Sequence, residues 1–228
     1  MDLATSVRHP PARRQLERRL ITVSNFDIKK AHPRLYSPKA GDVVTVDVPP
    51  LRFFRVDGHG DPNTTRSYVD AVTTLYTASY AARAIAKTEL GRVHTVAPLE
   101  GLWSADDPEV FTARKKSEWD WTMMIAQPDW ISEEIANEAA RAATRKGAPA
   151  VDLLRFDEYT EGMSVQVLYV GSYDDEGPAL AHLHHTYMPE NDLTWNGRHH
   201  EIYLSDPRKT APEKLRTILR QPVKPTKA

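Results

Sequence analysis

The feature of this sequence that most constrains the fold is an order of apolar segments that occurs twice along the chain. In the first half, apolar runs at 43–48 and 51–57 precede an amphipathic stretch at 64–87, and two more runs follow at 96–104 and 119–127. Alternating, β-branched runs are typical of strands, and a period of 3.6 is typical of a helix. The first half is therefore predicted to fold as strand, strand, helix, strand, strand.

The second half repeats this order. Its predicted elements are strands at 152–159 and 164–170, a helix at 176–188, and strands at 199–205 and 215–223. One such unit cannot bury its sheet face alone, so we expect the two units to pair about a pseudo-twofold axis. An α+β protein with a cleft between its halves follows, and such clefts are common sites for small molecules.

A separate amphipathic helix is predicted at about 132–147, between the two halves. Ser132 is placed to cap it, Glu133 and Glu134 lie in its first turn, and Gly147 is a natural stop. The pattern fits a linker packed between the halves and equally fits an ordinary core helix.

The predicted organisation has four parts. They are an N-terminal extension at 1–40, a first module at about 41–130, the helix at about 132–147, and a second module at about 151–224.

Composition excludes several classes of protein. The chain has 228 residues, a formal net charge of −1 and no cysteine. Disulfide scaffolds, thiolate metal sites and cysteine nucleophiles are excluded, and no strong field favours nucleic acid or a membrane. No segment has the roughly 20 apolar residues that cross a bilayer. The Arg-rich segment at 1–22 does not resemble a secretory signal, so we expect a cytoplasmic protein.

The strand predicted at 199–205 carries the best candidate for a ligand-binding centre. Alternation places His199, Glu201 and Tyr203 on one face. A carboxylate within a sheet needs a partner or a wet cleft, because burying an unpaired charge is costly. The alternatives are a solvated sheet face and a ligand cleft, of which the cleft is favoured.

Aligning the halves matches residues 99–104 to residues 200–205, so Glu100 would correspond to Glu201. A twofold axis would then bring these two carboxylates together across the cleft. Neighbouring carboxylates shift each other's ionisation, and one keeps its proton near neutral pH. Glu100 and Glu201 are therefore the candidate catalytic pair for general acid–base chemistry.

Aromatic residues supply the candidate walls of the cleft. Flat ligands stack on such side chains, and cationic ligands gain further from the ring faces. Alternation also places the second and third of these tryptophans on the same side of their strand. The candidates are Trp103, Trp119, Trp121, Tyr76, Tyr80 and Tyr173.

The histidines do not form a recognisable metal site. His182 and His185 lie one helical turn apart, but no third ligand has a suitable spacing. Gly58-His59-Gly60 lacks the residues of a phosphate loop, and no serine has the surroundings of a nucleophile elbow. We predict neither a metal nor a cofactor.

Several segments resemble one known family. Residues 199–207, followed by 212–217, are similar to the C-terminal signature of GyrI-like proteins. Gly171-Ser172-Tyr173 resembles that family's glycine-proline-tyrosine turn, with Ser172 in place of proline. Residues 99–103 and 119–128 resemble its stand-alone branch, which lacks a DNA-binding domain. The resemblance covers roughly residues 40–224.

The resemblance implies two split βαββ modules with antiparallel sheets, related by a pseudo-twofold axis around a central cleft. Relatives include effector domains of multidrug-sensing regulators, a gyrase-inhibitory protein and hydrolases that open cyclopropane-bearing alkylating compounds. The glutamate that faces ligands in the drug-sensing relatives falls on Glu201.

Three functions stay open at this point. The first is binding of aromatic, hydrophobic or cationic small molecules, the second is a hydrolase using Glu100 and Glu201, and the third is a protein-interaction module. No helix-turn-helix pattern precedes the fold, so direct DNA binding is not expected. The sequence predicts no oligomeric state.

Overall fold

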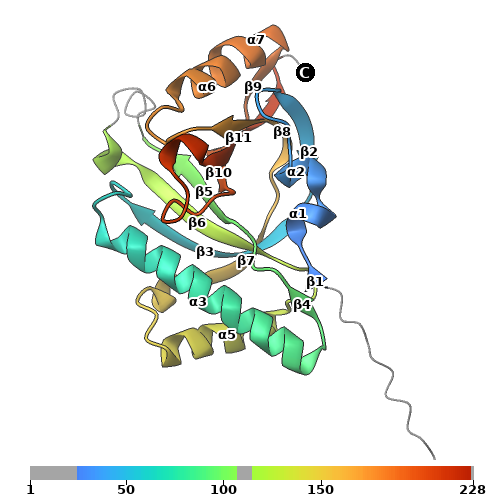
Figure 1. Cartoon of the computed structure of the whole chain (residues 1–228), viewed down its shortest axis with the longest axis vertical. Helices are drawn as coiled ribbons and strands as arrows, with labels where there is room; N and C mark the ends of the chain where they lie inside the picture. Colours follow the sequence, from blue (N-terminus) through green and yellow to red (C-terminus); the bar gives the residue numbers. More distant parts are fainter. Residues whose placement is uncertain (1–24, 107–114, 227–228) are drawn as a thin grey trace, which may run out of the picture.

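The computed structural model describes residues 25–106 and 115–226, and within them one nine-stranded sheet forms the centre of the molecule (Figure 1). Its strand order is β2-β8-β11-β10-β5-β6-β3-β7, and β9 pairs with β11 at one side. The bounds are β2 Val44–Val48, β3 Leu51–His59, β5 Leu99–Ser104, β6 Asp120–Gln127, β7 Arg155–Tyr159, β8 Gly162–Val170, β9 Leu193–Trp195, β10 His199–Tyr203 and β11 Arg216–Pro225.

The helices lie outside this sheet, and a separate parallel pair joins β1 to β4. Those two strands span Asn25–Phe26 and Val93–His94. The α-helices are α1 Ile28–Ala31, α2 Pro33–Tyr36, α3 Arg66–Glu89, α5 Glu133–Arg145, α6 Gly177–His182 and α7 Met188–Glu190. A π-helical turn, Leu183–Tyr187, joins α6 to α7, and short 3₁₀ turns occupy Lys116–Glu118, Val151–Leu153 and Pro212–Lys214.

The strand order reflects the relation between the two halves. Exchanging β2, β3, β5 and β6 with β7, β8, β10 and β11, respectively, gives the same order read from the opposite edge of the sheet. β5 and β10 pair antiparallel at the centre, with Gly101 opposite Glu201. β2 precedes β3 in the chain but pairs with β8, and β7 precedes β8 but pairs with β3. Each half therefore gives its first strand to the other, and the predicted fold of two pseudo-symmetric split βαββ modules is confirmed.

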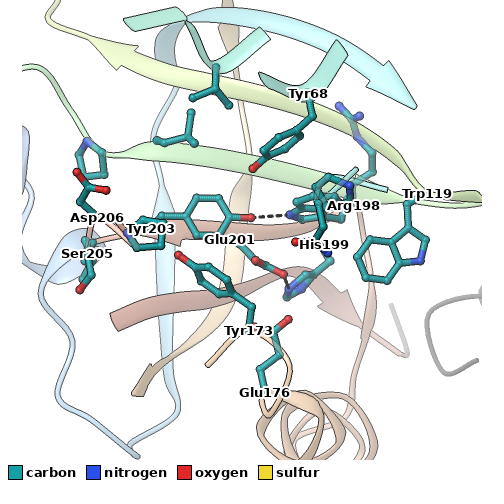
Figure 2. Close-up of a pocket in the computed structure, with 18 of the residues that line it drawn as sticks. Tyr68, Trp119, Tyr173, Glu176, Arg198, His199, Glu201, Tyr203, Ser205 and Asp206 are labelled. Atoms are coloured by element: carbon teal, nitrogen blue, oxygen red, sulfur yellow. Dashed lines mark hydrogen bonds and ion pairs between the residues drawn. The ribbon is translucent and has the colours of Figure 1, made fainter. Parts of the chain in front are cut away.

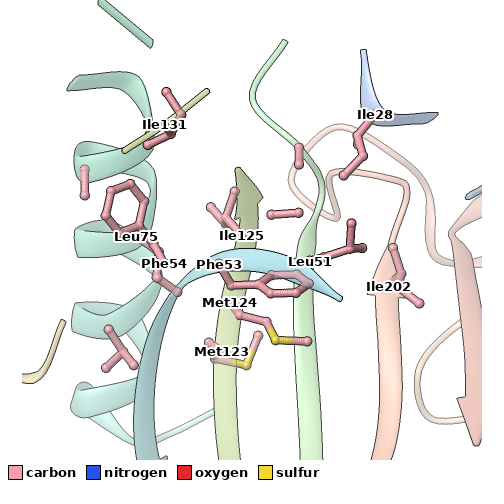
Figure 3. Close-up of a cluster of buried hydrophobic side chains, with 14 of the residues drawn as sticks. Ile28, Leu51, Phe53, Phe54, Leu75, Met123, Met124, Ile125, Ile131 and Ile202 are labelled. Atoms are coloured by element: carbon pink, nitrogen blue, oxygen red, sulfur yellow. The ribbon is translucent and has the colours of Figure 1, made fainter. Parts of the chain in front are cut away.

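Both faces of the sheet are covered. Neighbouring residues of a strand point to opposite faces, yet Phe53 and Phe54 are both buried. On the side of Phe54, α3 packs against β3 and β6 with Leu75 in the core (Figure 3). On the other face, the short helices α1 and α2 add Ile28 and Tyr36 to the same core.

Gly58 shows how a sequence signal for a turn can serve packing instead. The loop chemistry at 58–63 predicts that the strand ends before Gly58, but β3 continues through His59. The ring of Trp121 lies where a Cβ of residue 58 would be. Only glycine leaves room for this buried indole, whose Nε1 donates to the Gly60 carbonyl.

Several elements differ from the predictions. No element was predicted in the N-terminal extension at 1–40, but its described part contains α1 and α2, and β9 was not predicted either. The 132–147 helix is present, with Ser132 accepting from the Ile135 N–H, but it packs on α3 rather than between the halves. The Arg-rich segment 1–22 lies outside the described residues. Among the helices that the structure describes, none has the length and apolar character to span a bilayer.

Candidate ligand-binding cleft

A cleft of about 2120 Å³ lies over the central strands β5 and β10 (Figure 2). One wall is α3, and the other is α6 with the π-helical turn that follows it. Ligand pockets usually measure about 300–1,000 Å³, so this cleft can hold a large ligand or admit ligands of several shapes. The aromatic and ionisable side chains that line the cleft include Tyr68, Tyr76, Tyr80, Trp103, Trp119, Tyr173, His184, Trp195, His199, Glu201 and Tyr203.

Glu201 lies at the centre of the cleft floor. Alternation along β10 turns His199, Glu201 and Tyr203 towards the cleft, while His200 points to the other face. The residue opposite Glu201 is Gly101, which has no side chain. A Cβ there would lie 3.0 Å from Trp103 Nε1 and 3.2 Å from Met123 Sδ. The pseudo-twofold axis therefore passes beside one carboxylate, not between two.

Aromatic and imidazole groups surround the Glu201 carboxylate, whose side chain is only 11% exposed. His199 Nε2 is 3.5 Å from Glu201 Oε1. The Tyr203 hydroxyl hydrogen-bonds Glu201 and accepts a 3.1 Å hydrogen bond from Trp103 Nε1. Figure 2 shows Tyr68 and Tyr173 on either side of this group.

The phenols around Glu201 stay protonated at neutral pH. Burial, and next the negative charge of Glu201, raise the pKa of Tyr173 to about 12. The same two causes raise the pKa of Tyr68 and of Tyr203 further. Each hydroxyl can therefore donate a hydrogen bond to the carboxylate or to a ligand.

No lysine or arginine forms an ion pair with Glu201 within residues 25–106 and 115–226. Its nearest basic side chain is His199, whose Nε2 lies 3.5 Å from Glu201 Oε1. A carboxylate with so little exposure and no lysine or arginine beside it is costly for the protein alone, and a positive charge placed next to it would lower that cost.

The family comparison agrees with this geometry. The model of the GyrI-like small molecule binding domain matches residues 42–224. The chain belongs to the GyrI-like family. None of the curated proteins matches the chain.

Solved structures support the same assignment. An uncharacterized conserved protein from Listeria innocua is 35% identical, with a TM-score of 0.80 over 88% of this chain and 100% of that one. A hydrolase encoded by lin2189 from Listeria innocua is 33% identical, with a TM-score of 0.79 and the same coverage. The C-terminal domain of EcmrR, at 12% identity and a TM-score of 0.50 over 81% of this chain and 98% of that one, shares the fold.

Most of the predicted wall residues line this GyrI-like cleft. Trp103 and Trp119 meet edge to face with ring centroids 5.6 Å apart, and Tyr76 stacks on Tyr80 at 6.4 Å. Tyr80 is 57% exposed, so it lies at the rim. Tyr173 packs edge to face on Tyr203 at 5.6 Å.

Trp121 is the exception among the predicted aromatic residues. It lies on the same face of the sheet as Trp103, its register partner, but α3 covers it. Its buried ring contacts the Tyr68 ring edge to face at 5.3 Å and does not line the cleft. Trp119 precedes β6 and lines the cleft, so the two tryptophans lie on the same side of the sheet, as predicted, but only Trp119 contributes to the cleft.

Glu100 does not face Glu201. It lies opposite Ile202 in the β5–β10 ladder, which turns it to the other face of the sheet. There its Oε1 accepts a 2.9 Å hydrogen bond from the Tyr36 hydroxyl. The alignment that matched glutamate to glutamate is one residue out of register, and a shift of one residue exchanges the faces of a strand. The predicted catalytic pair is not assembled.

On that second face, Glu100 belongs to a buried polar network. His200 lies between two carboxylates, with Nε2 3.0 Å from Glu100 Oε2 and Nδ1 3.1 Å from Glu161. Arg220 Nη1 is 3.1 Å from Glu161 Oε2, and its Nη2 donates to the Leu35 carbonyl of α2. We call Tyr36, Glu100, Glu161, His200 and Arg220 the buried network.

Charge pairing sets the ionisation of this network. Burial opposes ionisation of Glu161, but His200 and Arg220 outweigh it and lower the pKa of Glu161 to about 2. Burial likewise opposes a charge on His200, and Glu161 and Glu100 outweigh it, so that the pKa of His200 is raised. The network satisfies its own charges and has no contact with the cleft.

The sequence reasoning missed two kinds of residue. Tyr68 was not among the predicted cleft residues, and its position near the start of α3 puts it over Glu201. His184 and Trp195 also line the cleft and were not predicted as cleft residues. Among the described residues, no three potential ligands form a metal site.

Proposed function

We propose that the cleft binds largely apolar aromatic small molecules that carry a positive charge, with Glu201 as the counter-charge. The observation that carries this proposal is the surroundings of Glu201. Its side chain is 11% exposed, and among the described residues the only basic group within ion-pair distance is the His199 imidazole. A ligand cation would supply the missing partner, and nearby ring faces would add a cation–π attraction of about 0.5–2 kcal/mol.

The cleft walls favour flat ligands. Trp103 with Trp119, and Tyr76 with Tyr80, present aromatic surface on different sides of the cleft. Offset or edge-to-face contacts with a ligand ring are worth about 0.5–1.5 kcal/mol beyond the area that they bury. These walls would provide affinity for many aromatic shapes, and Glu201 would select for charge.

A matched pair of probes tests the charge preference. 1-Methyl-4-phenylpyridinium is a permanent cation, and 4-phenylpyridine has nearly the same shape but is neutral at pH 8. Titration calorimetry at pH 8 should show the cation binding at least about tenfold more tightly, which is about 1.4 kcal/mol. Glu201→Gln should remove this preference while the neutral probe binds as before.

Glu100→Gln is the control, because it removes a carboxylate from the opposite face of the same strand pair. It should keep the preference for the cation in samples that melt cooperatively. Equal binding of the two probes by the unchanged protein, or a preference that survives Glu201→Gln, would contradict the proposal.

A hydrolase is the second candidate, because the 33% identical Listeria protein, covered over its whole length, is described as a hydrolase. Opening an activated cyclopropane by water needs a base for the water and a proton donor for the carbonyl conjugated to the ring. In this mechanism Glu201 takes the proton of the water, whose oxygen bonds to a ring carbon. The carbon–carbon bond breaks, and its electron pair moves to the carbonyl oxygen, which Tyr68 or Tyr173 protonates.

Mass spectrometry tests the second candidate. A spirocyclopropyl dienone incubated with the protein in H₂¹⁸O should gain one labelled water, and Glu201→Gln should slow this by about 10²–10⁴-fold, the usual contribution of a general base. Absence of turnover, together with charge-selective binding, would leave the binding function alone. The protein-interaction function and the cytoplasmic location stay predictions from the sequence.

A further inference from the structure

The cleft contains a second polar region beside Glu201. It is formed by His184 of the π-helical turn, Trp195 of β9 and His199 of β10, all of which line the cleft. The His184 ring lies against the Trp195 ring with centroids 4.3 Å apart, and it meets the His199 ring edge to face at 5.7 Å. Three segments that are separate in the sequence thus build one corner of the cleft.

Three ring nitrogens in this corner lack hydrogen-bond partners. His184 Nε2 and both nitrogens of His199 are buried, and no donor or acceptor in the described part of the chain bonds to them. His199 Nε2 has only the 3.5 Å approach to Glu201. Buried polar atoms are nearly always satisfied, because an unmade hydrogen bond costs about 1–3 kcal/mol. In a ligand cleft, such atoms indicate groups that a ligand would satisfy.

The charge state of His184 limits the kinds of ligand group that this corner of the cleft can bind. Burial, and then the neighbouring His199 and His185, lower the pKa of His184 to about 3. The imidazole is therefore neutral at physiological pH and offers one N–H donor and one lone pair. This combination suits an uncharged hydroxyl or carbonyl group, and it offers no positive charge to attract an anion.

The helical segment that carries His184 departs from α-helical geometry. Residues 183–187 form a π-helical turn, which is wider than an α-helical turn and is frequent at functional sites. Pro189 lies in the turn that follows, and it has no N–H to donate to the carbonyl of His185. One α-helical hydrogen bond is thereby lost where the turn widens.

We propose that His184 and His199 form a subsite for an uncharged oxygen-bearing group of the ligand, next to the position of its cationic group at Glu201. This inference rests on the proposed binding function and narrows the ligand class. The preferred ligand is an aromatic cation that also carries a neutral hydroxyl or carbonyl group. Trp195, stacked on His184, would cover the ring that bears this group.

Two probes that differ by one group test the subsite. They are 1-methyl-4-phenylpyridinium and its derivative with a hydroxymethyl group in the para position of the phenyl ring. Calorimetry should show the unchanged protein binding the hydroxymethyl probe about fivefold more tightly, as expected for one or two net hydrogen bonds. His184→Phe keeps a ring against Trp195 but has no ring nitrogen, so it should abolish this preference.

The control is His182→Phe, because His182 is the last residue of α6, directly before the π-helical turn, and does not line the cleft. It should retain the fivefold preference. Glu201→Gln should weaken both probes by the same factor and also keep the preference. If His184→Phe does not fold, His184→Leu provides the same test, since it also lacks ring nitrogens.

Each remaining outcome is decisive. Equal binding of the two probes by the unchanged protein, or a preference that survives His184→Phe, overturns the subsite while the proposed cation binding stands. Failure of both probes to bind overturns the proposed function and this inference together.

Discussion

The two faces of the β5–β10 pair differ in whether their buried carboxylates have charged partners within the protein. On one face, Glu100 lies in the buried network, whose carboxylates are matched by His200 and Arg220. On the other face, Glu201 has no lysine or arginine within ion-pair distance among the residues that the structure describes, and its basic neighbour there is the His199 imidazole. The first arrangement stabilises the fold. In the second, the carboxylate is left free to pair with a positively charged ligand.

The buried network also fixes the N-terminal helices on the sheet. The Tyr36 hydroxyl donates to Glu100, and Arg220 donates to the Leu35 carbonyl at 2.8 Å. Gln166 adds a 2.8 Å hydrogen bond to the Arg34 carbonyl. Loss of the network should therefore release α2 as well as expose an unpaired charge, whereas loss of Glu201 should do neither.

The largest expected effect is from Arg220→Met. The substitution leaves Glu161 and Glu100 buried with only His200 as a cation, and breaking a buried pair costs about 3–5 kcal/mol. Urea unfolding monitored by circular dichroism should show a loss of this size. Arg155→Met, which removes the half-exposed ion pair with Asp57, should cost less than about 1 kcal/mol. Similar losses for the two variants would show that the network contributes no more than a surface pair.

The second effect is a loss of stability in acid that depends on Glu161. Because folding lowers the pKa of Glu161 to about 2, its ionisation stabilises the fold above about pH 4.5 and is progressively lost as the pH falls towards 2. The difference in unfolding free energy between the unchanged protein and Glu161→Gln should therefore be about 2 kcal/mol smaller at pH 3 than at pH 6. A difference that does not change with pH would mean that Glu161 is not held ionised.

The smallest expected effect is from Glu201→Gln. Removing a poorly solvated charge that lacks a cation should leave the unfolding free energy unchanged or raise it by up to about 1 kcal/mol. Urea unfolding without ligand measures this. A loss of more than about 2 kcal/mol in unfolding free energy would mean that Glu201, like Glu100, is paired with a positively charged group of the protein itself.

These two faces also show what the sequence can and cannot predict. Alternation along β10 correctly grouped His199, Glu201 and Tyr203, because the period of a strand is a local property. The pairing of Glu100 with Glu201 failed because it depended on the register between two strands about 100 residues apart, which apolar patterns do not determine. The true counterpart of Glu201 is Gly101, and a glycine carries no pattern that would identify it as part of a site.

The remaining errors have similar causes. Helix periodicity predicted α3 to within two residues of its ends, but it could not show which tyrosine lies over Glu201. Trp121 and Trp119 differ in surroundings because the strand begins between them and because α3 covers only Trp121. The π-helical turn that carries His184 packs against β8, and α7, which follows it, packs against β9, a strand that the sequence did not predict.

The most direct test is a crystal structure of the protein with 1-methyl-4-phenylpyridinium. The account predicts that the pyridinium ring lies in the cleft within about 6 Å of the Glu201 carboxylate, the range in which opposite charges favour each other, with the buried network unchanged. A probe bound elsewhere, or a Glu201 carboxylate paired with a lysine or arginine of the protein in place of the probe, would contradict it.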